Sequence, residues 1–243
     1  MDHLPRTAIV LAAGLGTRMR PITNTVPKPL VPVGDKALID YGLDALAEAG
    51  VQRAIVNVHH LADQLEAHLD RRERPIIEIS DERERLLNSG GGFAKAVRMA
   101  GDDPVFLLNA DTFWIDALGT NALRRLAQHW DAGQMDMLCL MVPLDRAVGH
   151  TGRGDFALEH GTHGRLSWSK DGAVYAGAAI VSPHVVRGDE PNAYSFSLHF
   201  NQLIETGRLH GVLLDGLWLT VGTPDAIGEA ERAMDDYRSA LVP

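Results

Sequence analysis

Short runs of β-branched and apolar residues alternate with helical patterns through the first half of the chain. Residues 7–12 form the first strand-like run, and residues 38–49 repeat their apolar positions at helical spacing before Gly50, a residue type that commonly ends a helix. The same region predicts a helix over residues 61–69 and strands over residues 54–58, 76–79 and 105–108. Such alternation is typical of strand-helix-strand units. We therefore expect an α/β fold with three layers and a mostly parallel, Rossmann-like sheet.

The second half of the chain is less regular. It predicts strands over residues 137–142, 175–181 and 209–214, and helices over residues 196–206 and 226–237. The Gly- and His-rich stretch 148–164 is expected to form a loop and a short hairpin, a small antiparallel insertion at the side of the fold. A chain of 243 residues with 45% hydrophobic residues can bury a substantial core, so we expect residues 1–243 to form one domain.

Charge and cysteine content narrow the class of partner and the compartment. The net charge of −9 is spread along the chain, and no block of Lys and Arg is dense enough to neutralise a run of nucleic-acid phosphates. The amino-terminal residues lack a signal-peptide pattern, and no apolar stretch approaches the roughly 20 residues of a membrane span. The single cysteine, Cys139, lies in an apolar run and is expected to be buried and unreactive. We expect a cytoplasmic location with no nucleic-acid or membrane partner, and the sequence leaves the oligomeric state open.

A glycine-rich loop directly follows the first predicted strand. It reads Leu-Ala-Ala-Gly-Leu-Gly-Thr-Arg-Met-Arg-Pro over residues 11–21. Gly14 and Gly16 allow the backbone to approach an anion closely, Thr17 adds a hydroxyl group, and Arg18 adds a forked cation. The loop lacks the Gly-Lys-Ser/Thr ending of a Walker loop and the third glycine of the dinucleotide fingerprint. The pattern predicts a phosphate-binding cradle of another kind.

Lys28 follows this loop and lies between two prolines. Each proline fixes its own φ and restricts the residue before it, so the lysine is expected on a stiff, extended segment. An isolated lysine of this kind is usually a solvated surface residue. Lys28 comes only ten residues after Arg18, on a chain that leaves the same strand end, which favours its return to the same phosphates.

Residues 11–33 resemble the signature of the sugar-nucleotidyltransferase family, Leu-Ala-Ala-Gly-x-Gly-Thr-Arg-x-x-Pro-x-Thr followed by Pro-Lys-Pro-Leu-x-Pro-Val. The resemblance implies a glycosyltransferase-A-like fold and a Mg²⁺-dependent reaction that joins a nucleoside triphosphate to a sugar 1-phosphate and releases pyrophosphate. It implies a nucleotide-binding half over about residues 1–112 and a sugar-binding half over about residues 113–243. The roles it gives to Arg18 and Lys28 are catalytic, since both balance charge on the phosphates. The triphosphate would bind Leu11, Ala12, Ala13, Gly14, Gly16, Thr17, Arg18 and Lys28.

A second glycine-rich segment, Asn88-Ser89-Gly90-Gly91-Gly92, is predicted to open a helix at Phe93. A turn that only starts a helix would explain the bare pattern equally well. In the family this segment borders the nucleobase, which places Ser89, Gly90 and Gly91 among the nucleotide-binding residues. Its form resembles the Thr-Gly-Gly-Gly segment of the branch that uses uridine nucleotides, and this implies UTP.

Asn109 and Asp111 follow the strand over residues 105–108 and are expected to point into the same crevice as the glycine-rich loop. Asp111 is the best candidate Mg²⁺ ligand, with a helix-capping aspartate as the alternative. In the family the matching aspartate binds Mg²⁺ and the matching asparagine contacts the substrate, which gives Asp111 a catalytic role as well. The family's second ligand lies in a Trp-x-Asp-x-Gly-Thr segment, where this chain has Thr220, a weak and neutral ligand. Asp215 could substitute only if the strand were re-registered.

The sugar-phosphate pocket of the family corresponds to Asn109, Gly154, Asp155, Tyr175 and Gly177, although core packing also explains the tyrosine. The chain lacks the Glu-Lys-Pro motif of the thymidylyltransferases. It is most similar to the short bacterial branch that includes N-acetylmuramate-1-phosphate uridylyltransferases of cell-wall recycling. The alternatives are a mannose-1-phosphate guanylyltransferase, another hexose enzyme, or a nucleotide-sensing module that has lost catalysis. The eleven histidines lack recognised zinc-ligand spacing and are expected in loops and at the surface.

Overall fold

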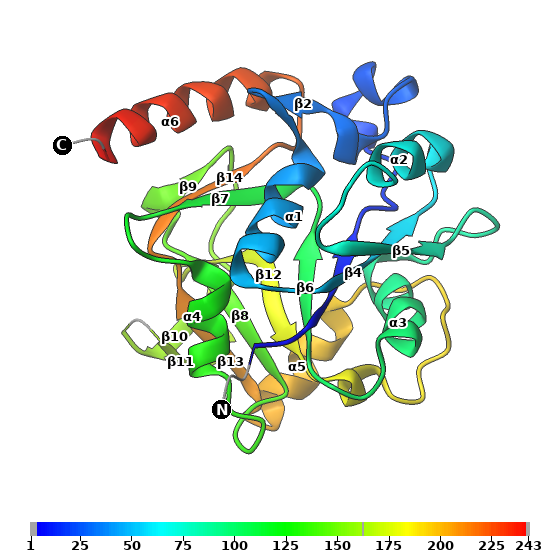
Figure 1. Cartoon of the computed structure of the whole chain (residues 1–243). Helices are drawn as coiled ribbons and strands as arrows, with labels where there is room; N and C mark the ends of the chain where they lie inside the picture. The colour runs from blue at the N-terminus through cyan, green and yellow to red at the C-terminus, as the bar shows by residue number, and fades with distance from the viewer. Residues whose placement is uncertain (1–3, 162, 242–243) are drawn as a thin grey trace.

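A computed structural model describes residues 4–161 and 163–241 of the protein (Figure 1). Residues 1–3 of the amino-terminal segment and Thr162 of the expected hairpin lie outside the described residues. One nine-stranded sheet runs through the molecule in the order β10-β11-β13-β8-β12-β6-β1-β4-β5. In that order the strands are Phe156–His160, His163–Trp168, Leu209–Leu213, Met137–Val142, Val174–Val181, Val105–Asn109, Thr7–Leu11, Arg53–Val58 and Ile76–Asp81.

The alternating first half of the chain forms a parallel block. Strands β6, β1, β4 and β5 are mutually parallel, as are β13 and β8. Strand β12 runs antiparallel to both of its neighbours, and β10, β11 and β13 pair antiparallel. The sheet is therefore parallel where the alternation predicted it and mixed over its whole width, because β10, β11 and β12 follow one another without an intervening helix among the described residues.

Helices cover both faces of this sheet. Helices α1 (Leu38–Ala49), α2 (Ala62–Leu69) and α4 (Ala122–His129) share one buried cluster, and α3 (Asn88–Ala100) and α5 (Ser197–Glu205) share the other. In Figure 1, α1 and α4 lie in front of the sheet and α5 lies behind it. The three-layer α/β class expected from the sequence is confirmed.

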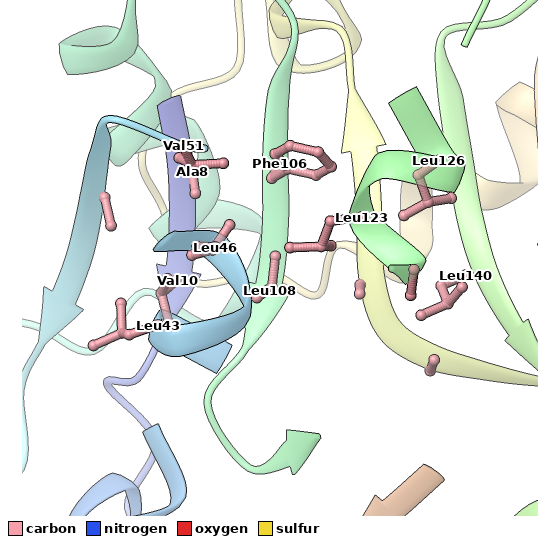
Figure 2. Close-up of a cluster of buried hydrophobic side chains, with 14 of the residues drawn as sticks. Ala8, Val10, Leu43, Leu46, Val51, Phe106, Leu108, Leu123, Leu126 and Leu140 are labelled. Atoms are coloured by element: carbon pink, nitrogen blue, oxygen red, sulfur yellow. The ribbon is translucent and has the colours of Figure 1, made fainter. Parts of the chain in front are cut away.

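Helix α1 shows why the sequence folds in this way. Leu43 and Leu46 lie one turn apart on the face that packs on the sheet, and both are fully buried (Figure 2). The helix ends at Gly50, whose φ of 103° is in the left-handed region that other residues avoid. Strand β8 is buried along its whole length, which fits a central strand covered on both faces.

A smaller three-stranded sheet stands beside the main one, in the order β7-β14-β9. Its strands are Thr112–Asp116, Gly216–Thr220 and Ala147–Val148, and helix α6 (Asp225–Leu241) packs against it through Ala230 and Met234. The sequence patterns did not predict β7, β14 or α4. The remaining elements are the short pair β2 (Pro32–Val33) and β3 (Lys36–Ala37) and five 3-10 turns: η1 (Thr17–Met19), η2 (Ile22–Asn24), η3 (Lys28–Leu30), η4 (Leu144–Arg146) and η5 (Pro183–Val186).

Cys139 is fully buried in β8, as its apolar neighbours predicted, and burial raises the pKa of its thiol far above the ordinary value. Among the described residues, no helix combines the length and the apolar character needed to cross a bilayer.

Leu46 tests the importance of the α1 face. We expect Leu46→Ala to lower the free energy of unfolding by about 2–5 kcal/mol, because the truncated side chain leaves a cavity between α1 and the sheet. Leu118→Ala is the matched control: Leu118 is 70% exposed, and we expect a change within about 0.5 kcal/mol. Urea denaturation followed by circular dichroism measures both variants. Equal effects of the two substitutions would contradict this description of the core.

Candidate active site

A cavity of about 360 Å³ opens at the carboxyl ends of β1 and β6. Strand β1 pairs with β4 on one side and with β6 on the other, so the order in which strands are added to the sheet reverses at β1. Such a switch point is where open α/β sheets bind ligands. The cavity is lined by Leu11, Ala12, Ala13, Gly14, Leu15, Lys28, Pro29, Asn57, Leu86, Asn88, Ser89, Asn109, Ala110 and Asp111.

The glycine-rich loop presents a row of backbone N–H groups at this cavity. The amides of Ala12 and Ala13 donate to Asn57 Oδ1 at 2.5 and 3.2 Å. The next three amides, those of residues 14–16, donate to no acceptor within the part of the chain that the structure describes. Gly16 has a φ of 61°, and its carbonyl accepts a hydrogen bond from the Thr23 hydroxyl at 2.8 Å. Successive unpaired amides in a tight turn form an anion-binding concavity, which is the chemistry predicted for this loop.

Lys28 returns to the cavity, as its spacing from the loop predicted. Its Nζ lies 2.7 Å from Asp111 Oδ2, and the residue is only 9% exposed. Lys28 is the first residue of η3, so the expected extended segment is in fact the start of a 3-10 turn, with Pro27 in the extended conformation before it and Pro29 inside it. A buried ammonium group needs a partner, and Asp111 supplies one.

Asp111 offers a carboxylate at the cavity wall, with its side chain 38% exposed. The register of β7 with β14 places Thr220 opposite Thr112, and the Val221 amide donates to the Asp111 carbonyl at 3.4 Å. Thr220 thus lies close to Asp111 in the fold, without adding a charge. No group of three or more His, Cys, Asp or Glu residues in the described chain is arranged to hold a metal ion. One carboxylate fits Mg²⁺, which commonly takes one or two and completes its octahedron with phosphate oxygens and water.

Arg18 and Thr17 lie on η1, at the exposed side of the loop, and do not line the cavity. The guanidinium group of Arg18 packs beside Gly222: a Cβ atom at Gly222 would lie 3.2 Å from Arg18 Nη1. The arginine therefore contacts the segment that follows β14, and its catalytic role stays a prediction.

The second glycine-rich segment lies inside helix α3, which begins at Asn88 and not at Phe93 as predicted. Ser89 lines the cavity, and its Oγ accepts the Phe196 amide at 3.0 Å. Gly90 and Gly91 face away from the cavity, toward the chain that precedes α5. A Cβ atom at Gly90 would lie 2.2 Å from the Tyr194 ring, and one at Gly91 would lie 1.8 Å from the Asn192 carbonyl oxygen. Packing against residues 192–194 explains both glycines.

Two of the predicted sugar-phosphate residues lie together at the end of β6. Gly177 has a φ of 75° at an irregularity in β12, and a Cβ atom there would lie 2.9 Å from Asn109 Nδ2. The Ala176 carbonyl next to it accepts hydrogen bonds from Thr112 Oγ1 at 3.0 Å and from Trp218 Nε1 at 2.8 Å. The polar contacts behind Asn109 thus join the main sheet to the small sheet.

The other predicted sugar residues lie farther along the second half. Asp155 Oδ2 accepts the Tyr175 amide at 2.9 Å, and Gly154 packs so closely on Gly172 that a Cβ atom would lie 2.1 Å from its carbonyl oxygen. The Tyr175 ring packs against Phe200 of α5, and its hydroxyl group is buried without a hydrogen-bond partner in the described chain. Burial raises the pKa of Tyr175 well above its ordinary value. The side chain therefore contributes to the core, and sugar binding by these residues stays a prediction.

Six residues of the cavity wall were not among the predicted site residues. Four of them lie within the motifs that the sequence singled out, and two lie outside these motifs: Leu15, Pro29, Asn88 and Ala110 within, Asn57 and Leu86 outside. Asn57 interrupts an otherwise apolar strand, a signal that could have drawn attention to it. Asn88 adopts a φ of 57°, which no local pattern revealed.

Comparison with known proteins identifies the family. Residues 7–149 match the model of the nucleotidyl transferase family. The chain is 41% identical over 239 residues to N-acetylmuramate alpha-1-phosphate uridylyltransferase of Caulobacter vibrioides, covering 95% of this chain and 98% of that protein. The chain belongs to the nucleotidyl transferase family. The enzyme class implied by the signature over residues 11–33 is confirmed.

More distant similarities agree. The chain is 29% identical over 222 residues to mannose-1-phosphate guanylyltransferase catalytic subunit beta of Danio rerio, covering 89% of this chain but 61% of that protein. A solved UDP-glucose pyrophosphorylase complexed with UDP-glucose has a TM-score of 0.80 at 17% identity, covering 95% of this chain and 98% of that one. At that identity the likeness shows the fold, and it confirms the nucleotidyltransferase fold.

Two glycines of the predicted nucleotide site differ sharply in their surroundings. We expect Gly91→Ala to lower the free energy of unfolding by about 1–3 kcal/mol, because the added methyl group collides with the Asn192 backbone. No atom lies within 4 Å of a Cβ atom at Gly14, so Gly14→Ala should leave stability nearly unchanged while it narrows the approach to the loop amides. Thermal denaturation and UTP titration separate the two effects. Stability losses of the same size would contradict the packing role of Gly91.

Proposed function

We propose that this protein transfers UMP from UTP to N-acetylmuramate 1-phosphate and releases pyrophosphate. One observation carries the proposal: unpaired loop amides, a buried lysine and a carboxylate meet in a single cavity at the switch point of the sheet. These are the groups that a triphosphate and its counter-ion require. The choice of uridine and of N-acetylmuramate rests on the relative that is 41% identical over nearly the whole chain.

The reaction that fits this site is an in-line attack of a sugar-1-phosphate oxygen on the α-phosphorus of the nucleotide. The phosphate nucleophile is already ionised at neutral pH, so the site needs no general base. Catalysis then consists of alignment of the two substrates and stabilisation of the negative charge that develops on the leaving pyrophosphate. The amides of residues 14–16 hold the triphosphate, and Lys28 is the cation nearest to it in the cavity wall.

Mg²⁺ is the cofactor we propose, with Asp111 as its protein ligand. When bound, the ion offsets negative charge on the phosphate oxygens. Thr220 stands where a second carboxylate would add negative charge. Phosphate oxygens and water would therefore fill the other coordination positions of the ion, and most of the negative charge around it would come from the nucleotide. Lys28 and the ion would share Asp111, and Lys28 would then be available to a phosphate oxygen.

Asn109 is the residue that we assign to the sugar phosphate, because it stands at the cavity edge nearest to β12. Arg18 would reach the phosphates only if its side chain or the loop moved away from Gly222 on binding. We place the enzyme in the cytoplasm, where UTP is available, and in the recycling of cell-wall sugar phosphates. The second candidate is a mannose-1-phosphate guanylyltransferase, which the 29% identical relative favours.

Pyrophosphate release tests this proposal. The protein is incubated with Mg²⁺, with each of UTP, dTTP, GTP and CTP, and with N-acetylmuramate, N-acetylglucosamine, glucose and mannose 1-phosphates. We expect turnover that is highest with UTP and N-acetylmuramate 1-phosphate. Preference for GTP and mannose 1-phosphate would favour the second candidate. Nucleotide binding without turnover for any pair would identify a sensing module.

Lys28→Ala tests the role of the buried cation. We expect kcat to fall by about 10²–10³-fold, because a charge that stabilises the departing pyrophosphate is lost from a dry site. Lys36→Ala is the control: Lys36 pairs with Asp44 away from the cavity and should keep wild-type kcat. Steady-state kinetics with saturating UTP measures both. A wild-type kcat in the Lys28 variant would remove this residue from the catalytic machinery.

A further inference from the structure

A buried pair of polar side chains lies beneath the glycine-rich loop. Asn57 lies near the end of β4 and Glu82 follows β5, and each is only 2% exposed. Asn57 Nδ2 donates to Glu82 Oε1 at 2.7 Å, and Glu82 Oε2 accepts the Leu87 amide at 3.0 Å. No Lys or Arg side chain forms an ion pair with Glu82 in the described chain, so backbone and amide donors hold this carboxylate.

The surrounding sequence is adapted to this pair. A Cβ atom at Gly92 would lie 2.7 Å from both Asn57 Nδ2 and Glu82 Oε1, so only glycine leaves room for the two side chains beside helix α3. The Glu82 amide donates to the Val58 carbonyl at 2.8 Å, and its own carbonyl oxygen lies 2.7 Å from His59 Nδ1. Glu82 thus connects the ends of β4 and β5 to the start of α3.

The direction of these hydrogen bonds permits only one orientation of the Asn57 side-chain amide. Both Glu82 oxygens act as acceptors, so the Asn57 nitrogen must face Glu82. Asn57 Oδ1 must then face the loop, where it accepts the amides of Ala12 and Ala13. These two amides are turned inward, and the amides of residues 14–16 that follow have no protein acceptor in the described chain.

We propose that Glu82 is a positioning residue for the nucleotide. Glu82 fixes the orientation of the Asn57 side-chain amide. Asn57 in turn holds the Ala12 and Ala13 amides, and the amides of residues 14–16 that follow are left to bind the phosphates. Glu82 does not itself line the cavity, and Asn57 does. This inference rests on the proposed function in one respect, namely that the cavity binds the nucleotide's phosphates.

The single variants break the pattern in different ways. Glu82→Gln introduces an NH2 group without a free acceptor. This group would face the Leu87 N–H or Asn57 Nδ2, and if the Asn57 side chain rotated to accept it, Asn57 Nδ2 would face the Ala12 N–H. In every orientation two donors oppose each other. In Asn57→Asp, two carboxylates stand at hydrogen-bonding distance. We expect each variant to raise the Kd for UTP by about tenfold or more, since a misplaced donor disturbs the loop.

The exchanged pair, Asn57→Asp with Glu82→Gln, restores every hydrogen bond. The carboxylate introduced at position 57 would accept the two loop amides on one oxygen and the new side-chain amide from position 82 on the other. The carbonyl oxygen of that side-chain amide would accept the Leu87 amide, so the number of donors, acceptors and charges is unchanged. We expect the Kd for UTP of the double variant to return to within about threefold of wild type, a coupling that separate structural roles would not produce. Glu78→Gln is the control: Glu78 lies on the same strand β5 and pairs with Arg53 away from the cavity.

Isothermal titration with UTP and Mg²⁺ on the full chain measures the Kd values, and amide hydrogen exchange at Ala12 and Ala13 gives a readout that needs neither ligand nor turnover. The inference is supported if exchange is faster and UTP binding weaker in the single variants and both recover in the double variant. It is overturned if Glu82→Gln binds UTP within about threefold of wild type, or if the double variant binds no better than the singles or does not fold. If the single variants do not fold, the double variant decides alone. Absence of UTP binding by the wild-type protein would refute the proposed function, and hydrogen exchange would still test the pair.

Discussion

The parallel pairing of β1 with both β4 and β6 is the constraint on which the rest of the site depends. Because the sheet extends in two directions from β1, the chains that leave Leu11 and Asn109 enter one crevice. The glycine-rich loop and Asp111 meet there although they lie far apart in the sequence. Lys28 then joins the two by its ion pair with Asp111, so sheet topology, and not local sequence, assembles the charged groups.

Within the described chain, the cavity wall carries one cation, Lys28, and one carboxylate, Asp111, in a protein whose net charge is −9. A negative net charge repels any anion at long range, so an anion site in this chain has to attract its ligand through local groups. The unpaired loop amides provide part of this local attraction without ordering any side chain. Lys28 adds a full positive charge that is shielded from solvent. A lysine buried to this extent is tolerated because its ammonium group forms an ion pair with Asp111. The same ion pair therefore stabilises the buried lysine and holds its ammonium group at the cavity wall.

Sequence patterns predicted the elements that carry their own local signals, such as an apolar stripe with a terminal glycine, and the elements whose residues are all buried. Helix α1 and strand β8 have the predicted bounds, since one has a clear apolar stripe with a terminal glycine and the other is apolar throughout. Strands β7 and β14 were missed because each depends on the other, a distant partner in the sequence, and β7 follows β6 after only a short turn. In the site, the signature predicted that the loop and Lys28 belong together, and the position of Asp111 after a strand predicted that it enters the same crevice. Asn57 and the position of Arg18 beside Gly222 depend on tertiary contacts that no local pattern carries.

The sequence predicted that the glycines of α3 border the nucleobase, and the structure gives a packing reason for each of them. Glycine within a helix costs about 1 kcal/mol relative to alanine, so a run of three needs a compensating interaction. At each position the structure shows a neighbour that leaves no room for a Cβ atom: the Tyr194 ring at Gly90, the Asn192 carbonyl at Gly91, and the Asn57–Glu82 pair at Gly92. The contacts of Gly90 and Gly91 turn away from the cavity, whereas Gly92 faces Asn57, which lines it. At the start of α3 the cavity is lined by Leu86, Asn88 and Ser89, so packing, and not the cavity, accounts for Gly90 and Gly91.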